Sequence, residues 1–79
     1  MVSLEVKRAR HSWHYFDVKL SGPDVVAERR LGRTSLRIIL LEFRKTGRIQ
    51  VGNVEATVPS ATERTRMIEM AEAEMREEV

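Results

Sequence analysis

The first twenty residues alternate between apolar and polar side chains, and this period of two restricts the fold more than any other feature of the chain. The alternation runs through two segments, at about 2–9 and 13–20, with a short junction between them. Because successive side chains of a strand point to opposite faces, we predict an antiparallel hairpin with one apolar face. That core face consists of Val2, Leu4, Val6, Phe16, Val18 and Leu20. The outer face carries Lys7, Trp13, Tyr15 and Lys19.

A turn signal follows the second run. Ser21, Gly22 and Pro23 interrupt the alternation, and the carboxylate of Asp24 can accept a hydrogen bond from the first turn of a helix. We therefore predict a short helix at about 25–31. It ends at Gly32, because glycine readily adopts the positive φ that terminates helices.

The segment 34–45 is the most hydrophobic part of the chain. Helical spacing relates four of its apolar residues, which are Leu36, Ile39, Leu40 and Phe43. Thr34 is a suitable N-cap and Gly47 a suitable C-cap, so we predict a helix. A buried strand that turns back into a strand at 48–51 remains the alternative.

A helix over 34–45 has apolar groups on a second flank, at Ile38 and Leu41. Another part of the structure has to cover them, because adjacent exposed apolar groups mark interaction surfaces. We expect either the C-terminal helix or a second subunit in this place. A homodimer through Ile38, Leu41 or the C-terminal helix is therefore one predicted partnership.

The rest of the chain predicts a hairpin and a helix. Strands at about 48–51 and 54–58 flank Gly52-Asn53, a pair suited to a tight turn, and a single strand with a bulge at Gly52 is the alternative. Ser60 and Glu63 have the spacing of a capping box, which predicts a helix at about 61–77. Its apolar stripe, suited to the core or to a partner, is Met67, Ile68, Met70, Ala71 and Met75.

Together these elements predict an α+β fold with a small antiparallel sheet packed by two or three helices. The 79 residues provide for one core, so we expect a single domain over 1–79. The chain has no cysteine, and therefore neither disulfides nor thiolate-bound metal contribute. It has no run of apolar residues long enough for a membrane span and no leader pattern at its start, so we expect a cytoplasmic protein with no membrane partner.

The charges are unevenly distributed along the chain. Residues 1–50 contain eleven Lys or Arg and five acids, whereas residues 51–79 contain three Lys or Arg and seven acids. An anionic partner would therefore meet the N-terminal two thirds. The predicted electrostatic footprint for nucleic acid consists of Arg29, Arg30, Arg33, Arg37, Arg44 and Arg48.

The order of predicted elements from residue 25 onward resembles the layout of a winged helix-turn-helix. A short helix, the turn at Gly32, the helix over 34–45 and the hairpin after Thr46-Gly47 follow one another as in that class. The resemblance implies a second helix that enters the major groove and a hairpin that touches phosphates. Ala27 and Gly32, however, stand five residues apart, where the motif usually has four.

Two aromatic residues among cations also indicate nucleic-acid binding. Trp13 and Tyr15 lie among cations such as Lys7 and Lys19, and exposed aromatic rings among cations can stack on bases. The same residue types concentrate binding energy at protein interfaces, so a protein partner fits them equally.

Catalytic and metal sites are not predicted. Ser12 has His11 and His14 nearby but no orienting acid at a known spacing, and the glycines form no phosphate-binding loop. With Asp17, the histidines form too small a ligand set for zinc, and positions 11 and 14 of a strand face opposite sides. We expect no enzyme, no cofactor and no metal.

The function we predict is that of a small non-enzymatic regulator that binds nucleic acid. The alternative is a protein-interaction module, an adaptor or inhibitor of the kind that phages and mobile elements encode against host proteins. The placement of Arg33, Arg37 and Arg44 discriminates between the two. One shared exposed face favours nucleic acid, whereas pairing with the acids of the last helix favours the adaptor.

Overall fold

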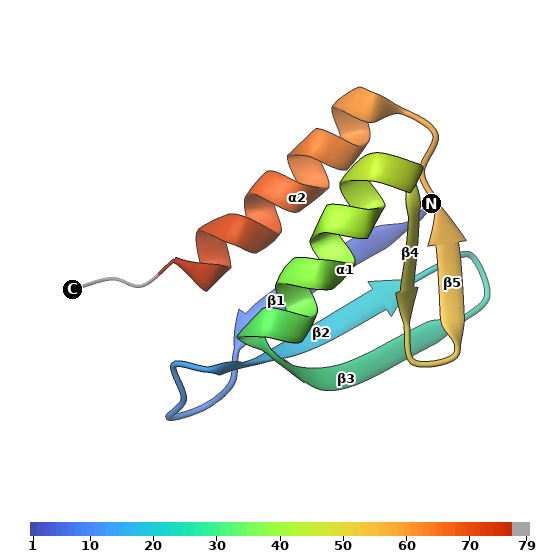
Figure 1. Ribbon diagram of the computed structural model, residues 1–79. Helices are drawn as coiled ribbons and strands as arrows, with labels where there is room; N and C mark the ends of the chain where they lie inside the picture. The colour runs from blue at the N-terminus through green and yellow to red at the C-terminus, as the bar shows by residue number, and fades with distance from the viewer. Residues whose placement is uncertain (77–79) are drawn as a thin grey trace.

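The chain folds into two antiparallel sheets and two helices, which confirms the predicted α+β class (Figure 1). The structure is a computed structural model that describes residues 1–76. Its elements in chain order are β1 (Ser3–Arg8), β2 (Tyr15–Ser21), β3 (Val26–Gly32), α1 (Arg33–Thr46), β4 (Arg48–Val51), β5 (Val54–Thr57) and α2 (Ala61–Met75).

Strands β1 and β2 form the predicted hairpin, and the predicted core face is correct. Their register runs from Ser3 opposite Ser21 to Arg8 opposite Phe16. The inward side chains of β2 are completely buried, and those of β1 pack against them. Of the residues predicted on the outer face of the hairpin, Trp13 does not belong to a strand, because it lies in the loop before β2 begins.

The segment predicted as a helix at 25–31 is instead strand β3, which pairs antiparallel with β2 from Tyr15–Gly32 to Ser21–Val26. A helix of seven residues has little stability of its own, whereas a strand here gives the second edge of β2 its backbone partners. Gly32 does not end a helix. Its φ is −70°, and it is the N-cap of α1 in place of the predicted Thr34.

Helix α1 confirms the helical prediction for 34–45, and the strand alternative is wrong. Leu36, Leu40 and Phe43 are buried, and the stripe points at the sheet. Gly47 ends the helix with a φ of 77°, and its N–H donates to the Phe43 carbonyl at 2.9 Å. A left-handed residue at this position is the usual way to satisfy the last carbonyls of a helix.

The predicted hairpin at Gly52-Asn53 is confirmed as β4–β5, and the single bulged strand is wrong. Gly52 takes a φ of 59°, which a tight turn requires at this position. Helix α2 begins as predicted, because the Ser60 Oγ accepts a hydrogen bond from the Glu63 N–H at 3.2 Å. Met75 is its last residue, and position 77 of the prediction lies outside the described residues.

Both helices lie on the same face of the three-stranded sheet (Figure 1). Helix α2 packs over β1 and beside α1, and the β4–β5 hairpin lies on the other side of α1. The predicted stripe of α2 is only partly buried, since Ile68, Ala71 and Met75 face the core while Met70 is 67% exposed. Within residues 1–76, no helix has the length and apolar content needed to cross a membrane.

The C-terminal end of α2 is held by arginines from two other elements. Its last turn contains no basic residue, although cations favour this negative end of a helix. Arg33 of α1 donates to the carbonyl of Met75, and Arg8 of β1 donates to the carbonyl of Arg76 at 3.2 Å. These two side chains therefore fasten α2 to the sheet and to α1.

We expect Arg33→Ala to lower the free energy of unfolding by about 2 to 4 kcal/mol, because the carbonyls that it serves lose a charged donor. Urea unfolding followed by circular dichroism measures the change. Arg37→Ala, one turn further along the same helix and exposed, is the control and should change stability by less than about 0.5 kcal/mol. Equal effects of the two variants would contradict the fastening role.

Candidate functional site

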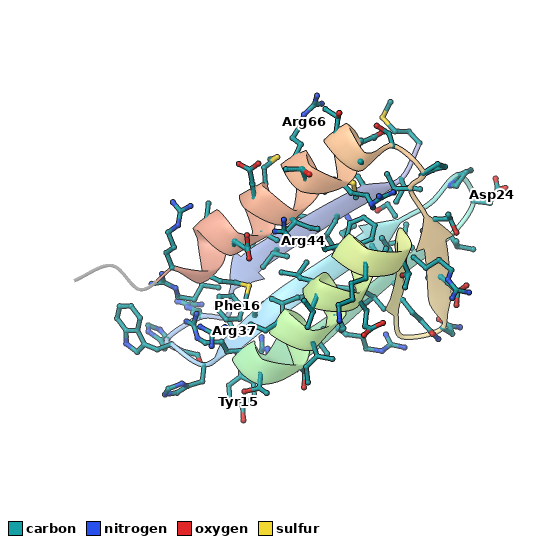
Figure 2. All side chains as sticks on the ribbon, turned by 45° about the horizontal axis from the view of Figure 1, so that its top comes forward. Tyr15, Phe16, Asp24, Arg37, Arg44 and Arg66 are labelled. Carbon is teal, nitrogen blue, oxygen red and sulfur yellow. The ribbon has the colours of Figure 1, made fainter. Side chains whose placement is uncertain are left out.

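Arginines gather at one end of the molecule, where the β1–β2 loop, the start of α1 and the end of α2 meet. We call this region the basic end. Its arginines are Arg8, Arg10, Arg33, Arg37 and Arg76. It also contains His11, Trp13, His14 and Tyr15, and its acids among residues 1–76 are Glu72 and Glu74. Figure 2 shows Tyr15 and Arg37 near this end and Asp24 at the opposite one.

Hydrogen bonds within the β1–β2 loop hold its backbone in place. The Ala9 N–H donates to the Tyr15 carbonyl at 2.9 Å, and the Ser12 N–H donates to the Ala9 carbonyl at 3.1 Å. The Ser12 Oγ accepts from the N–H groups of His14 and Tyr15, each at 3.2 Å. The loop is therefore shaped before any partner arrives, which lowers the entropic cost of binding.

The side chains of Arg8 and Arg33 contact this loop from the protein side, and these contacts make them unavailable to a ligand. Arg33 donates to the Trp13 carbonyl at 2.8 Å, and its guanidinium carbon lies 5.0 Å from the centre of the Phe16 ring. The guanidinium carbon of Arg8 lies 4.6 Å from the centre of the Trp13 ring. Cation–π contact of this kind fixes the indole without covering all of it, since Trp13 stays 52% exposed.

The remaining groups of the basic end are accessible. The side chains of Arg10, Arg37 and Arg76 are exposed, and none takes part in the ion pairs found within residues 1–76. Tyr15 is 52% exposed, like Trp13. Accessible cations beside accessible aromatic rings can hold anionic groups and flat rings at the same time.

Next to the basic end, a groove of about 410 Å³ runs between α1 and α2. Its walls include Arg33, Arg37 and Arg44. The placement of these three arginines discriminates between the nucleic-acid-binding and the adaptor functions predicted from the sequence. They do share one groove, but two of them are engaged with α2. Arg33 donates to the Met75 carbonyl, and Arg44 lies 3.5 Å from a carboxylate oxygen of Glu72. Arg37 alone of the three has neither an ion pair nor a side-chain hydrogen bond within residues 1–76.

The outer face of the three-stranded sheet is not a basic surface. Cross-strand pairing aligns its charged side chains in two rows of alternating sign, Glu5–Lys19–Glu28 and Lys7–Asp17–Arg30. The Lys7 ammonium lies 3.4 Å from a Glu5 carboxylate oxygen, and Arg30 Nε lies 2.9 Å from one of Asp17. The hydrogen bond to Asp17, with the attraction of its charge, raises the pKa of Arg30. The structure therefore does not combine Lys7, Lys19 and the aromatic residues into one cationic face.

The predicted arginine footprint is also divided among separate places. Arg29 lies on the inward face of β3, where its guanidinium approaches Gly52 and donates to the Glu28 carbonyl at 2.8 Å. Arg48 is exposed at the start of β4, past the C-terminal end of α1. The basic end lies at the other end of this helix, which is about 21 Å long.

The winged helix-turn-helix layout is absent, because the expected first helix is strand β3. Helix α1 consequently has no bracing helix in front of it. No family model, curated protein or solved structure matches the chain. Among residues 1–76, no group of three or more His, Cys, Asp or Glu side chains lies close enough to hold a metal ion.

Sequence reasoning missed Arg8, Arg10 and Arg76 as members of the basic end. One signal was available for the first two, since residues 6–16 contain three cations and no acid. Arg76 carried no such signal, because residues 72–78 around it contain four glutamates. Only the packing of α2 over β1 brings it to this end.

We expect Lys19→Glu to destabilise the fold by about 1 kcal/mol, because three carboxylates would then stand side by side across β1, β2 and β3. Chemical unfolding measures the difference. Lys45→Glu on the exposed side of α1 makes the same charge change without the cross-strand row, and we expect a smaller loss. An unchanged stability of the Lys19 variant would mean that the alternating rows contribute no energy.

Proposed function

We propose that the protein binds single-stranded nucleic acid at its basic end, without catalysis. One observation supports this most directly: the preformed β1–β2 loop presents Trp13, 52% exposed, at an end of the molecule where Arg10, Arg37 and Arg76 are exposed and take part in no ion pair within residues 1–76. Bases of an unpaired strand can stack on such a ring while the cations meet the phosphates.

A single strand suits this site better than a duplex. A duplex is read by a helix or a β-ribbon placed in a groove, and its bases are already stacked on each other. The basic end presents a loop with half-exposed aromatic rings, and these can reach only bases that are not stacked inside a helix. The neutral outer face of the sheet offers no additional phosphate contacts.

The residues have distinct roles in this proposal. Trp13 and Tyr15 provide ring surface for bases, and Arg10, Arg37 and Arg76 contact phosphates. Arg8 and Arg33 position the loop from the protein side, so their loss would act through the structure. A protein of this kind regulates by occupying the strand, which is consistent with the lack of a predicted catalytic site.

Trp13 is the only tryptophan of the chain, so its fluorescence reports the site directly. We expect quenching when short single-stranded DNA or RNA is titrated in at low salt. Three phosphate contacts predict that the logarithm of the binding constant falls with the logarithm of salt concentration with a slope of about −2. Labelled duplex in an anisotropy titration should bind more weakly than the single strands.

We expect Arg10→Glu to weaken single-strand binding about tenfold, because an attractive phosphate contact becomes repulsive. Arg66→Glu is the matched control, since Arg66 is exposed on α2 away from the basic end (Figure 2). Trp13→Ala should weaken binding by a similar factor and Trp13→Phe by less, because phenylalanine retains a ring for stacking.

Absence of binding at low salt would refute the proposal. Equal losses from Arg10→Glu and Arg66→Glu would also count against it, because the attraction would then be unspecific. A protein partner would in that case be the better explanation of the surface, since Trp, Tyr and Arg also concentrate binding energy at protein interfaces.

A further inference from the structure

The solvent side of α1 carries an apolar pair that no part of the described chain covers. Ile38 is 58% exposed and Leu41 is 50% exposed, although both are large aliphatic side chains. Thr34 lies one turn before this pair and Lys45 one turn after it. With 3.6 residues per turn, these four positions form one line along the exposed face of the helix.

The two edges of this line differ in charge. Arg37 and Arg44 lie on the edge that borders α2, where they line the groove between the helices. Glu42 lies on the opposite edge, where it lines a cleft with residues of β4. One edge of the exposed face is therefore positive and the other carries an acid.

We propose that this face binds a second copy of the chain, with the two α1 helices side by side and parallel. Their spacing gives Ile38 and Leu41 the places of the core positions a and d of a heptad, and in parallel coiled coils isoleucine at a with leucine at d favours two strands. Arg37 then has position g and Glu42 position e. In a parallel pair these two positions face each other, so Arg37 meets the partner's Glu42, twice per dimer.

An antiparallel pair has the opposite electrostatics. It brings the same edges of the two helices together, so Arg37 would face the partner's Arg44 and both cations would repel. The distribution of charge around the apolar pair therefore selects the parallel arrangement. Arg37 and Glu42 are also free for it, since neither takes part in an ion pair within residues 1–76.

The interface is small, with two large apolar residues from each copy, so the dimer is weak and reversible. Lys45 extends the line at a second a position, where a polar residue sets the register at a cost in stability. A parallel pair brings the starts of both α1 helices to the same side. Both basic ends would then face one strand together, with Arg10 and Arg76 of each copy left to contact phosphates, because Arg37 is paired with the partner's Glu42. The dimer itself does not depend on the proposed function.

Sedimentation equilibrium of the full chain without nucleic acid tests the dimer over concentrations that reach the millimolar range. We expect Arg37→Glu and Glu42→Arg each to weaken association about tenfold, since two attractions become two repulsions. The double variant, which exchanges the charges, should restore it. Arg37→Glu would instead strengthen an antiparallel pair, and that result would overturn the proposed arrangement.

A cysteine test reports the orientation independently, because the natural chain has no cysteine. Under mild oxidation Thr34→Cys should form a disulfide-linked dimer, since position 34 faces the same position of the partner only in a parallel pair. Thr62→Cys on the exposed side of α2 is the control. Ile38→Lys should abolish association, whereas Met70→Lys, an equally simple change on α2, should not. A monomer at all concentrations, or equal cross-linking of both cysteine variants, would refute the proposal.

Discussion

The C-terminal end of α2 is held by two arginines that come from far away in the sequence. Its last turn contains glutamates and no cation, so the negative end of the helix needs positive charge from elsewhere. Arg8 arrives from the first strand and Arg33 from the first turn of α1, and each donates to a terminal carbonyl. The same side chains hold the indole and the carbonyl of Trp13. One small cluster thus joins the sheet, both helices and the loop that we propose as a binding site.

Regular patterns made most of the fold predictable. The period of two in the first twenty residues, the stripe of α1 and the capping box of α2 each specify an element whose apolar side chains point one way. Strand β3 could not be predicted in this way. Its central residues Glu28, Arg29 and Arg30 are all charged, so apolar and polar side chains do not alternate along it. Its conformation is decided by the backbone groups of β2, a requirement that a local pattern does not contain. The basic end was equally hidden, because it is assembled from three distant segments.

The uneven distribution of charge along the sequence does not become two separate halves of the molecule. Glu72 and Glu74 come from the acidic C-terminal part, yet α2 lies beside α1 and β1 and brings them next to arginines. On the outer face of the sheet, Lys7 forms an ion pair with Glu5 of its own strand, and Arg30 forms one with Asp17 of the neighbouring strand. The exposed cations that the fold brings together with aromatic rings are a smaller set, around the β1–β2 loop. Counting charge along a chain therefore overestimates the surface that an anionic partner can use.

The three charged residues in the middle of β3 also affect how the protein behaves at high concentration. Strand β3 is an outer strand of its sheet, and one edge of its backbone lacks a neighbouring strand in that sheet. Such an edge can recruit strands from other molecules and start aggregation, and exposed charges along it oppose this by repulsion and by their hydration. The residues that obscure β3 in the sequence are therefore of the kind that oppose the addition of further strands at an open edge.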